Sequence, residues 1–301
     1  MSSITDQQVQ TQGEESDTLD RSIAGLDAIS LAQSVPRLRR TRRAWSATWP
    51  KLAAIALALG IWQLLVWSGW KPTYVLPPPA DVFQELWQLL LDGSLQSAVS
   101  VTLRRAAIGF SIAIAVGVLI GAPVSQIKGL RTAVGSMITG LQTMPSIAWF
   151  PLAILLFKIS EAAILFVVVL GAAPAIANGL ISGADNIPPI LRRAAKVLGA
   201  SGPALYREVI LPGSMPSFVA GLKQGWAFAW RSLMAGELLV IIANKASLGV
   251  QLQVARDFND STALLAVMIV IFVIGVLVDS LIFGTLERSI RRRRGLIDGA
   301  A

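Results

Sequence analysis

Of the 301 residues, 54% are hydrophobic and 15% are charged, and the mean hydropathy of +0.62 excludes a soluble protein and indicates a multi-span helical membrane protein. The net charge of +8 does not indicate a nucleic-acid-binding face, because the arginines lie at the ends of apolar runs, where they set membrane topology. Cysteine and histidine are absent, which excludes disulfides, Cys or His metal sites, and catalysis by a thiol or an imidazole.

Residues 1–44 form a hydrophilic tail that begins acidic and ends in a basic cluster at residues 37–43. The tail has too little apolar surface to offset the entropy of ordering, so we expect it to be disordered. It is not a signal peptide, because no small-residue cleavage site follows the first apolar run. We expect the cluster to hold the N-terminus in the cytoplasm, with binding of anionic headgroups as the alternative. Residues 45–301 are the predicted transmembrane domain.

The first predicted span, 51–70, is long enough to cross a hydrocarbon core of ~30 Å at ~1.5 Å per residue. Tryptophans lie near both of its ends, as interfacial anchors should. Three consecutive prolines then exclude a helix at residues 77–79. The apolar spacing of residues 80–92 predicts an amphipathic helix that is capped by Asp81 and lies on the outer surface.

The second predicted span, 103–124, contains Gly117 and Gly121, a spacing that lets helices approach closely but often occurs by chance. The third apolar stretch, 133–157, contains Pro145 and Pro151. Prolines free backbone carbonyls, which neighbours or a water-filled pathway must satisfy. A kinked packing helix and a pathway-lining segment are therefore equal alternatives for this stretch.

A polar, basic segment follows the fourth predicted span, 162–181, and separates it from the fifth. Its sequence from 192 to 212 is RRAAKVLGASGPALYREVILP. Two prolines precede it, where a helix start tolerates them, and Gly199 is a helix terminator. The segment predicts a short helix at about 190–203 with small residues on one face.

The fifth stretch, 215–243, contains Lys223, Arg231 and Glu237. Ionisable groups at membrane depth are functional candidates by default. Arg231 and Glu237 are six residues apart, so a regular helix does not pair them. Arg231 has two interpretations: a structural pair with a residue such as Asp279 in the last span, 263–283, or a guanidinium presented to a passing oxyanion.

The apolar stretches make six predicted spans, and the distribution of Lys and Arg between them predicts their orientation in the membrane. With the N-terminus inside, eighteen Lys and Arg lie on the inner side and six on the outer side, so the positive-inside rule places both termini in the cytoplasm. The 190–203 helix is then also cytoplasmic. Arg104 and Arg105 fit poorly, since they would start a helix on the outer side, and contact with another subunit is the only explanation that the sequence offers.

The 192–212 segment resembles the signature loop of ABC-importer permeases: Glu-Ala-Ala, three residues, Gly, nine residues, Ile-x-Leu-Pro. Every spacing matches, although Arg193 stands where the motif has Glu. Three further runs, YVLPPPADVFQEL, LPGSMPSFVAGLKQGWAFAW and SLGVQLQVARDFND, are similar to the sulfonate, taurine and nitrate permeases of that family, as is the Pro-x-x-Ala-Trp-x-Pro-Leu run that begins at Pro145.

The resemblance implies an all-α, six-span protein with the type I ABC-importer permease fold. It implies that the 190–203 segment is a coupling helix for a separate ATPase. The residues assigned to this coupling are Arg192, Arg193, Ala194, Ala195, Gly199, Ala200, Ser201, Leu211 and Pro212. The candidates for the translocation pathway are Pro145, Trp149, Pro151, Trp230, Arg231 and Glu237.

The chain has no Gly-x-x-x-x-Gly-Lys-[Ser/Thr], HExxH or Gly-x-Ser-x-Gly motif, so we expect neither a P-loop nor an enzyme active site, and no metal site. The resemblance implies a permease subunit in the bacterial inner membrane that works as a homodimer. ATP and Mg are then bound by partner ATPase subunits, and an external solute-binding protein delivers the substrate. Aliphatic sulfonate is the first choice of substrate, followed by taurine or nitrate.

A secondary transporter driven by an ion gradient is the alternative. It predicts inverted repeats with matched broken helices and paired carboxylates within the membrane. Glu237 and Asp279 are available, but the two halves of the chain show no convincing repeat.

Overall fold

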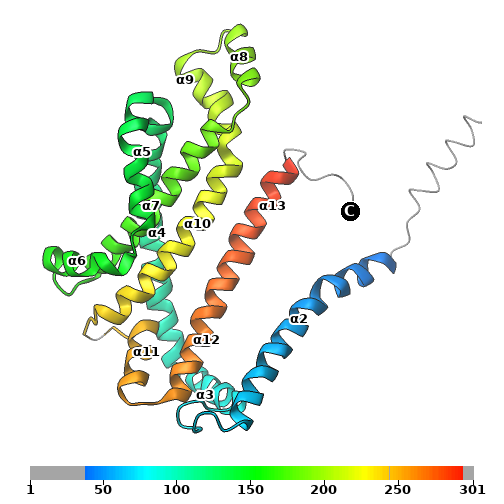
Figure 1. Ribbon diagram of the computed structural model, residues 1–301, viewed down its shortest axis with the longest axis vertical. Coiled ribbons are helices and arrows are strands. Elements are labelled where there is room, and N and C mark those ends of the chain that lie inside the picture. The colour runs from blue at the N-terminus through cyan, green and yellow to red at the C-terminus, as the bar shows by residue number, and fades with distance from the viewer. Residues whose placement is uncertain (1–37, 244, 294–301) are drawn as a thin grey trace, which may run out of the picture. The chain divides into compact units, whose positions relative to one another are not determined.

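The computed structural model describes residues 38–243 and 245–293, which are helical with irregular connections and contain no strand (Figure 1). The chain divides into two units, Met1–Ser68 and Gly69–Ala301. The first contains α2 (Leu38–Trp67), whose residues Trp49–Trp67 are long and apolar enough to span a membrane. Residues 38–44 of the predicted disordered tail are therefore helical, because Leu and Arg are good helix formers and extend the apolar helix towards the N-terminus. The rest of the tail, 1–37, lies outside the described residues.

The second unit is all helical. Its elements are α3 (Pro79–Leu91), α4 (Ser94–Gln126), α5 (Lys128–Thr143), η1 (Ser146–Trp149), α6 (Phe150–Phe157), α7 (Glu161–Asp185), α8 (Pro189–Val197), α9 (Gly202–Leu205), η2 (Tyr206–Ile210), α10 (Leu211–Leu239), α11 (Leu248–Asp257), α12 (Ser261–Leu277), η3 (Val278–Phe283) and α13 (Gly284–Arg293). Within this unit α8 and α9 lie at one end of α7 and α10, and α3 and α11 lie at the opposite end (Figure 1).

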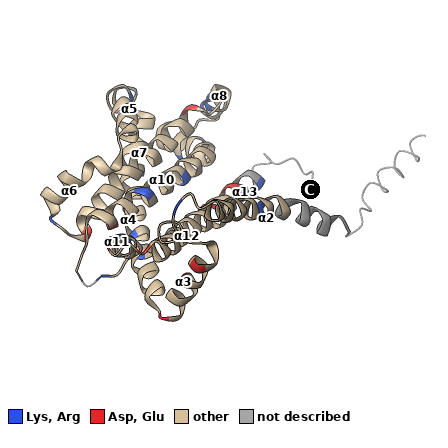
Figure 2. Ribbon diagram, turned by 60° about the horizontal axis from the view of Figure 1, so that its bottom comes forward, with Lys and Arg blue, Asp and Glu red and all other residues tan. Residues whose placement is uncertain are grey.

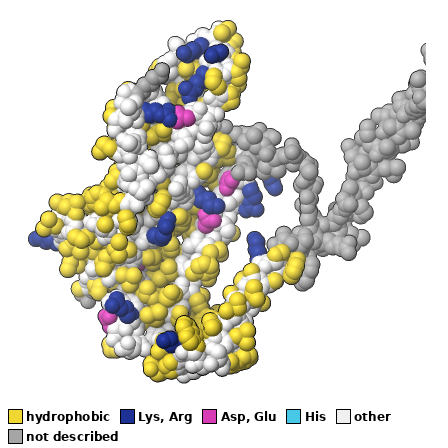
Figure 3. Space-filling view, viewed as in Figure 1, with side chains coloured by type: hydrophobic (Ala, Val, Ile, Leu, Met, Phe, Trp, Pro, Cys, Tyr) yellow, Lys and Arg dark blue, Asp and Glu magenta, His cyan; other side chains and the backbone are white. Residues whose placement is uncertain are grey.

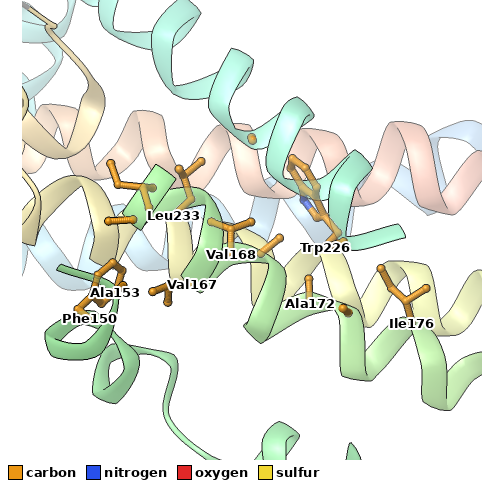
Figure 4. Packing of buried hydrophobic residues seen from close by; sticks show 14 of the residues in the cluster. Phe150, Ala153, Val167, Val168, Ala172, Ile176, Trp226 and Leu233 are labelled. Atoms are coloured by element: carbon orange, nitrogen blue, oxygen red, sulfur yellow. The ribbon is translucent and has the colours of Figure 1, made fainter. Parts of the chain in front are cut away.

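Helix α7 is the centre of the second unit and packs most extensively against α10 and α4. It is apolar around its whole circumference, as a helix buried on all sides should be. Val168 and Ile176 of α7 are fully buried and pack with Trp226 and Leu233 of α10 in the main core (Figure 4). This core fixes the relative positions of α4, α7 and α10, the three helices that carry the candidate site.

Glycines let these three helices approach to backbone contact. A Cβ added to Gly121 of α4 would lie 2.9 Å from the Cα of Ala177 in α7. A Cβ added to Gly221 of α10 would lie 2.7 Å from the Cα of Gly179 in α7. The spacing of Gly117 and Gly121, which often occurs by chance, here does mark a close approach, since both glycines face α7.

Helix α3 packs on α12 and α4 through a second, smaller core that includes Leu95, Leu248 and Val267. It is amphipathic as predicted, because Val82 is fully buried whereas the polar side chains of Asp81 and Gln84 are exposed. The predicted cap at Asp81 is wrong: the helix begins at Pro79 and Pro78 is its N-cap. Proline starts a helix here because its φ is preset and the N–H that it lacks would be unpaired in a first turn.

The third apolar stretch is not one straight helix. Residues Gly129–Thr143 and Ser146–Phe157 meet at an angle of 102°, and Pro145 lies at the break as the N-cap of η1. Four helices in the described part of the chain are long and apolar enough to span a membrane, or five if the bent pair counts as one span. Helix α10, which contains most of the fifth predicted stretch, has 29 residues but carries three charged side chains and is outside that count.

Leu211 and Pro212 begin α10 without a break in the chain's helical path. Elements α9, η2 and α10 follow one another without a gap, so the chain is helical from Gly202 to Leu239. Element η2 is a π-helical turn that directly precedes the proline. Its longer hydrogen-bond spacing accommodates the ring, which would clash with the carbonyl four residues earlier in a regular helix.

Replacing Gly221 by Ala should lower the thermal stability of the permease, because α7 and α10 would have to separate to make room for the methyl group. We expect a loss of about 1–3 kcal/mol, typical of overpacking. Fluorescence-detected size-exclusion chromatography after heating measures the midpoint temperature of thermal unfolding. The control is Gly135→Ala in α5, where an added Cβ meets nothing within 4 Å and the better helix propensity of Ala is favourable. Equal midpoints for both variants would contradict the close packing.

Candidate functional site

Helix α8 is a short helix with well-defined ends. Pro188 is its N-cap and Pro189 its first residue, and Gly199 follows its C-terminus with φ of +88°. The backbone N–H of Gly199 donates to the carbonyl of Lys196, and that of Ala200 donates to the carbonyl of Ala195. This pair of bonds is a Schellman motif, which needs a left-handed residue at the position of Gly199. The predicted helix end at Gly199 is confirmed.

The surface of α8 is apolar and basic at once. Its large apolar side chains are exposed, with Ile190 at 70% and both Val197 and Leu198 at 87%. Arg193 and Ala194 are exposed too, whereas Ala195 is nearly buried. Lys and Arg side chains gather at this end of the second unit (Figure 3), while α6 and α7 are largely uncharged (Figure 2). Exposed apolar groups rimmed by charges are typical of a protein-binding surface.

Side chains tie α8 and α5 to the end of α7. The guanidinium of Arg192 donates to the carbonyl of Ala184, and Arg131 of α5 forms an ion pair with Asp185. Helix α8 also packs against α9 and η2. A displacement of α8 therefore acts directly on α7 and on the helix that continues into α10.

The structure brings together most of the residues predicted for coupling. Those from 192 to 201 lie in α8 and in the turn that follows it. Leu211 and Pro212 do not join them, because α9 and η2 intervene and the two residues begin α10.

At the opposite end of the unit, a buried carboxylate of α10 links that helix to α4 and α11. Glu237 has no exposed surface. It accepts hydrogen bonds from Thr102 Oγ1 at 2.9 Å, from Arg105 Nη1 at 3.0 Å and from the backbone N–H of Gly249 at 3.1 Å. The backbone N–H of Leu248 in turn donates to Thr102 Oγ1 at 3.0 Å. Each oxygen of the carboxylate thus meets at least one donor, which is the condition for burying a charge.

Arg105 extends this network to α7. Its Nη2 lies 3.4 Å from Glu161, which also accepts from Lys245 at 2.6 Å. Arg105 is 5% exposed, because α4 begins at Ser94 and places it about 15 Å inside the helix. The expectation that Arg104 and Arg105 start a helix at the outer surface is therefore wrong. Glu237, the partner of Arg105, lies 132 residues away in the sequence. No periodic pattern of residues predicts a pairing over that separation.

Arg231 lies elsewhere on α10 and is exposed. Its Nε donates to the carbonyl of Ala227 at 3.1 Å, and its guanidinium lies over the ring of Phe228 at 4.8 Å. The predicted structural pair with Asp279 is wrong, because Asp279 pairs with Lys223 at 3.3 Å.

The guanidinium of Arg231 lines a cavity of about 320 Å³ at the break between α5 and η1. Pro145 lines the same cavity, together with Gln142 and Ser146. Sequence reasoning missed Gln142 and Ser146, and their place on either side of Pro145 is the only signal that could have identified them.

The other predicted pathway residues do not line this cavity. Trp149 packs against the main core, and Trp230 stacks on Trp226 with ring centroids 5.9 Å apart. Pro151 is exposed in the first turn of α6. Glu237 belongs to the buried network and does not face Arg231. No group of three or more Asp and Glu within the described ranges could hold a metal ion.

Comparison with known proteins shows what the chain is similar to. A family model described as "Binding-protein-dependent transport system inner membrane component" matches residues 113–292. SsuC of Escherichia coli, named as an aliphatic sulfonates transport permease, is 31% identical over 221 residues, which are 73% of this chain and 83% of SsuC. NrtB of Synechocystis, named as a nitrate import permease, is 27% identical over 240 residues, or 76% of this chain and 84% of NrtB.

The fold is similar to that of a chain of the MetNI methionine ABC transporter in an inward-facing crystal form. The TM-score is 0.57 at 20% identity, and the match covers 65% of this chain and 96% of the other. At that identity the similarity concerns the fold alone. It confirms the predicted type I importer permease fold.

Replacing Glu237 by Gln should destabilise the protein strongly, because Arg105 would remain buried without its charge partner. Breaking one side of a buried pair costs about 3 kcal/mol or more. Replacing both residues, Arg105→Leu with Glu237→Leu, removes the unpaired charge and should lose less stability than the sum of the single variants Arg105→Leu and Glu237→Leu. Thermal unfolding of the purified permease in detergent measures Glu237→Gln, the two single Leu variants and the double variant. Additive losses would contradict the pairing.

Proposed function

The chain belongs to the family of binding-protein-dependent transport system inner membrane components, and we propose that it is the membrane-spanning permease of an ATP-driven importer for a small oxyanion. It is a transport permease rather than an enzyme. A separate ABC ATPase binds ATP and Mg and drives it, and an external solute-binding protein delivers the substrate. Two copies of the chain form the pathway.

The observation that supports this proposal most is the surface of α8. A helix with Val197 and Leu198 almost fully exposed and a defined Schellman end is suited to dock into a cleft on a partner. Small residues at Ala194 and Gly199 let the partner's backbone come close. Arg193, in the place of the family's Glu, is exposed and would form an ion pair with an acidic side chain of the ATPase.

Movement of α8 passes to the pathway through stiff connections. When ATP binding closes the ATPase dimer, α8 moves with it and pulls on α7 through Arg192 and the carbonyl of Ala184. The continuous helix from Gly202 to Leu239 carries the same movement along α10 to Arg231. Rigid-body motion of packed helices is the usual means by which such transporters switch access.

The charge distribution supports placing α8 and both termini in the cytoplasm of a bacterial cell, with the chain in the inner membrane. Four positive charges lie at the α8 end of the second unit: Arg192, Arg193 and Lys196 in α8, and Arg131 in α5. Positively charged residues favour the cytoplasmic side. The α3 and α11 end would then face outward and receive the binding protein.

Aliphatic sulfonate is the substrate that we favour, then taurine or nitrate. Relatives named for aliphatic sulfonates and for nitrate both cover most of the chain, so the oxyanion head group is what these candidates share. Nothing supports the secondary-transporter alternative, which requires two matched broken helices. The described residues contain one bent helix pair, α5 with η1 and α6.

Replacing Gly199 by Val should uncouple transport, because a β-branched residue cannot hold φ of +88° and the end of α8 would rearrange. ATP-dependent uptake and copurification of the ATPase should both fall by at least about tenfold, a difference of about 1.4 kcal/mol in docking. Gly199→Asn is the matched control, since Asn tolerates the left-handed region. Uptake by the Val variant at the wild-type rate would rule out docking through this turn.

The orientation can be tested by single-cysteine labelling, because the natural chain contains no cysteine. Ser201→Cys, next to α8, should react with a membrane-impermeant maleimide only after the cells are opened. Asp257→Cys, at the end of α11, should react in intact spheroplasts. The reverse pattern would place α8 outside and exclude coupling to a cytoplasmic ATPase.

A further inference from the structure

The cavity at the break between α5 and η1 has the charge of an anion site. Arg231 is its one ionisable lining residue among the described residues, and no carboxylate lines it. Two other cations in the long helices are paired with carboxylates, Lys223 with Asp279 and Arg105 with Glu237. The cavity therefore has a positive charge and no carboxylate in its lining, and such a charge in an apolar helix bundle faces a water-filled space or a ligand.

The guanidinium of Arg231 is oriented but not saturated. Its Nε bond to the carbonyl of Ala227 and the contact with the Phe228 ring at 4.8 Å hold the side chain against its own helix. Within the described ranges no carboxylate lies within 4 Å of it, and its two Nη groups remain available. Two parallel N–H groups match two oxygens of a carboxylate, sulfonate or nitrate.

Gln142 supplies a second donor from the facing helix. Its Nε2 is buried and has no hydrogen-bond partner in the part of the chain that the structure describes, although the residue lines the cavity. Buried amide groups are almost always hydrogen-bonded, so an orphaned donor in a cavity wall is a place where a ligand acceptor is missing. Ser146, on the other side of the break, adds a hydroxyl to the same wall.

We propose that this cavity is an oxyanion-binding site within the translocation pathway, in which Arg231 and Gln142 hold the head group of the substrate. This inference rests on the proposed importer function and adds the residues that select for charge. About 320 Å³ accommodates a small anion with a short tail, at the lower end of the sizes usual for ligand pockets.

The placement of the two donors on different helices provides for release. Gln142 belongs to α5 and Arg231 to α10, and α10 continues the helical segment that packs against α8. A shift of α10 relative to α5 would separate the donors and weaken the hold on the anion. A deep charge in the pathway thus binds the anion in one state without trapping it in the other.

The test uses the full complex of permease, ATPase and binding protein in proteoliposomes, with methanesulfonate and nitrate as probes. Arg231→Gln should lower ATP-dependent anion uptake at least tenfold while the ATPase still copurifies with the permease. Arg231→Lys should restore part of the uptake. Arg288→Gln is the matched control, because Arg288 Nε donates to its own helix, to Gly284, at 2.9 Å but lies away from the cavity; its uptake should remain within twofold of wild type.

Gln142→Leu keeps the volume of the side chain and removes the donor, and it should lower anion uptake severalfold. If Arg231→Gln fails to assemble, the uptake of this variant tests whether the cavity binds the anion. The site would be overturned, and the importer function left intact, if the wild-type complex takes up either anion and the Arg231→Gln variant does so at the same rate. The same rate in an assembled Gln142→Leu variant would have the same meaning. Import of an uncharged solute, without import of either anion, would also overturn the anion site and leave the importer function intact. Absence of any ATP-dependent uptake by the wild-type complex would instead refute the importer function itself.

Discussion

The buried pair of Glu237 and Arg105 is the interaction on which the second unit depends. A carboxylate without exposed surface is tolerable in an apolar bundle only if donors meet its oxygens. Here those donors come from α4 and from the start of α11, while Arg105 reaches on to Glu161 at the start of α7. One end of four helices is thereby fixed, and movement driven from α8 must be taken up at the other end and along the helix axes.

Close backbone packing supplies the second constraint. Where Gly179 and Gly221 face each other, α7 and α10 touch with no side chain between them, so they resist separation more than sliding. Interfaces of this kind have few alternative arrangements, since interiors are packed near their maximum density. In the proposed coupling, a displacement of α8, which is attached to α7 through Arg192, would therefore move α7 and α10 together as a stiff body.

Sequence reasoning succeeded where the signal was local. The helix end at Gly199 followed from conformational preference, whereas the spacing of Gly117 and Gly121 permitted a close approach without naming α7 as the partner. Sequence reasoning failed where the outcome depended on distant partners, as with Arg105, whose pairing spans 132 residues. The continuous helix through Pro212 could not be predicted either, because a π-helical turn precedes the proline and no residue pattern announces that turn. The cavity beside Arg231 required knowledge of which way a broken helix turns.

The contrast between two arginines shows how function can be located in such a bundle. Arg105 and Arg231 both lie in long helices, but the first meets two carboxylates whereas the second meets only its own helix and an aromatic ring. A saturated charge contributes to assembly, and its removal leaves partners unpaired. An unsaturated charge that lines a cavity has no such structural partner, and in the site proposed above an anion in the cavity would be the partner of Arg231. The shape of the broken helix at Pro145 supplies the space, and the unpaired amide of Gln142 indicates the chemistry of what enters.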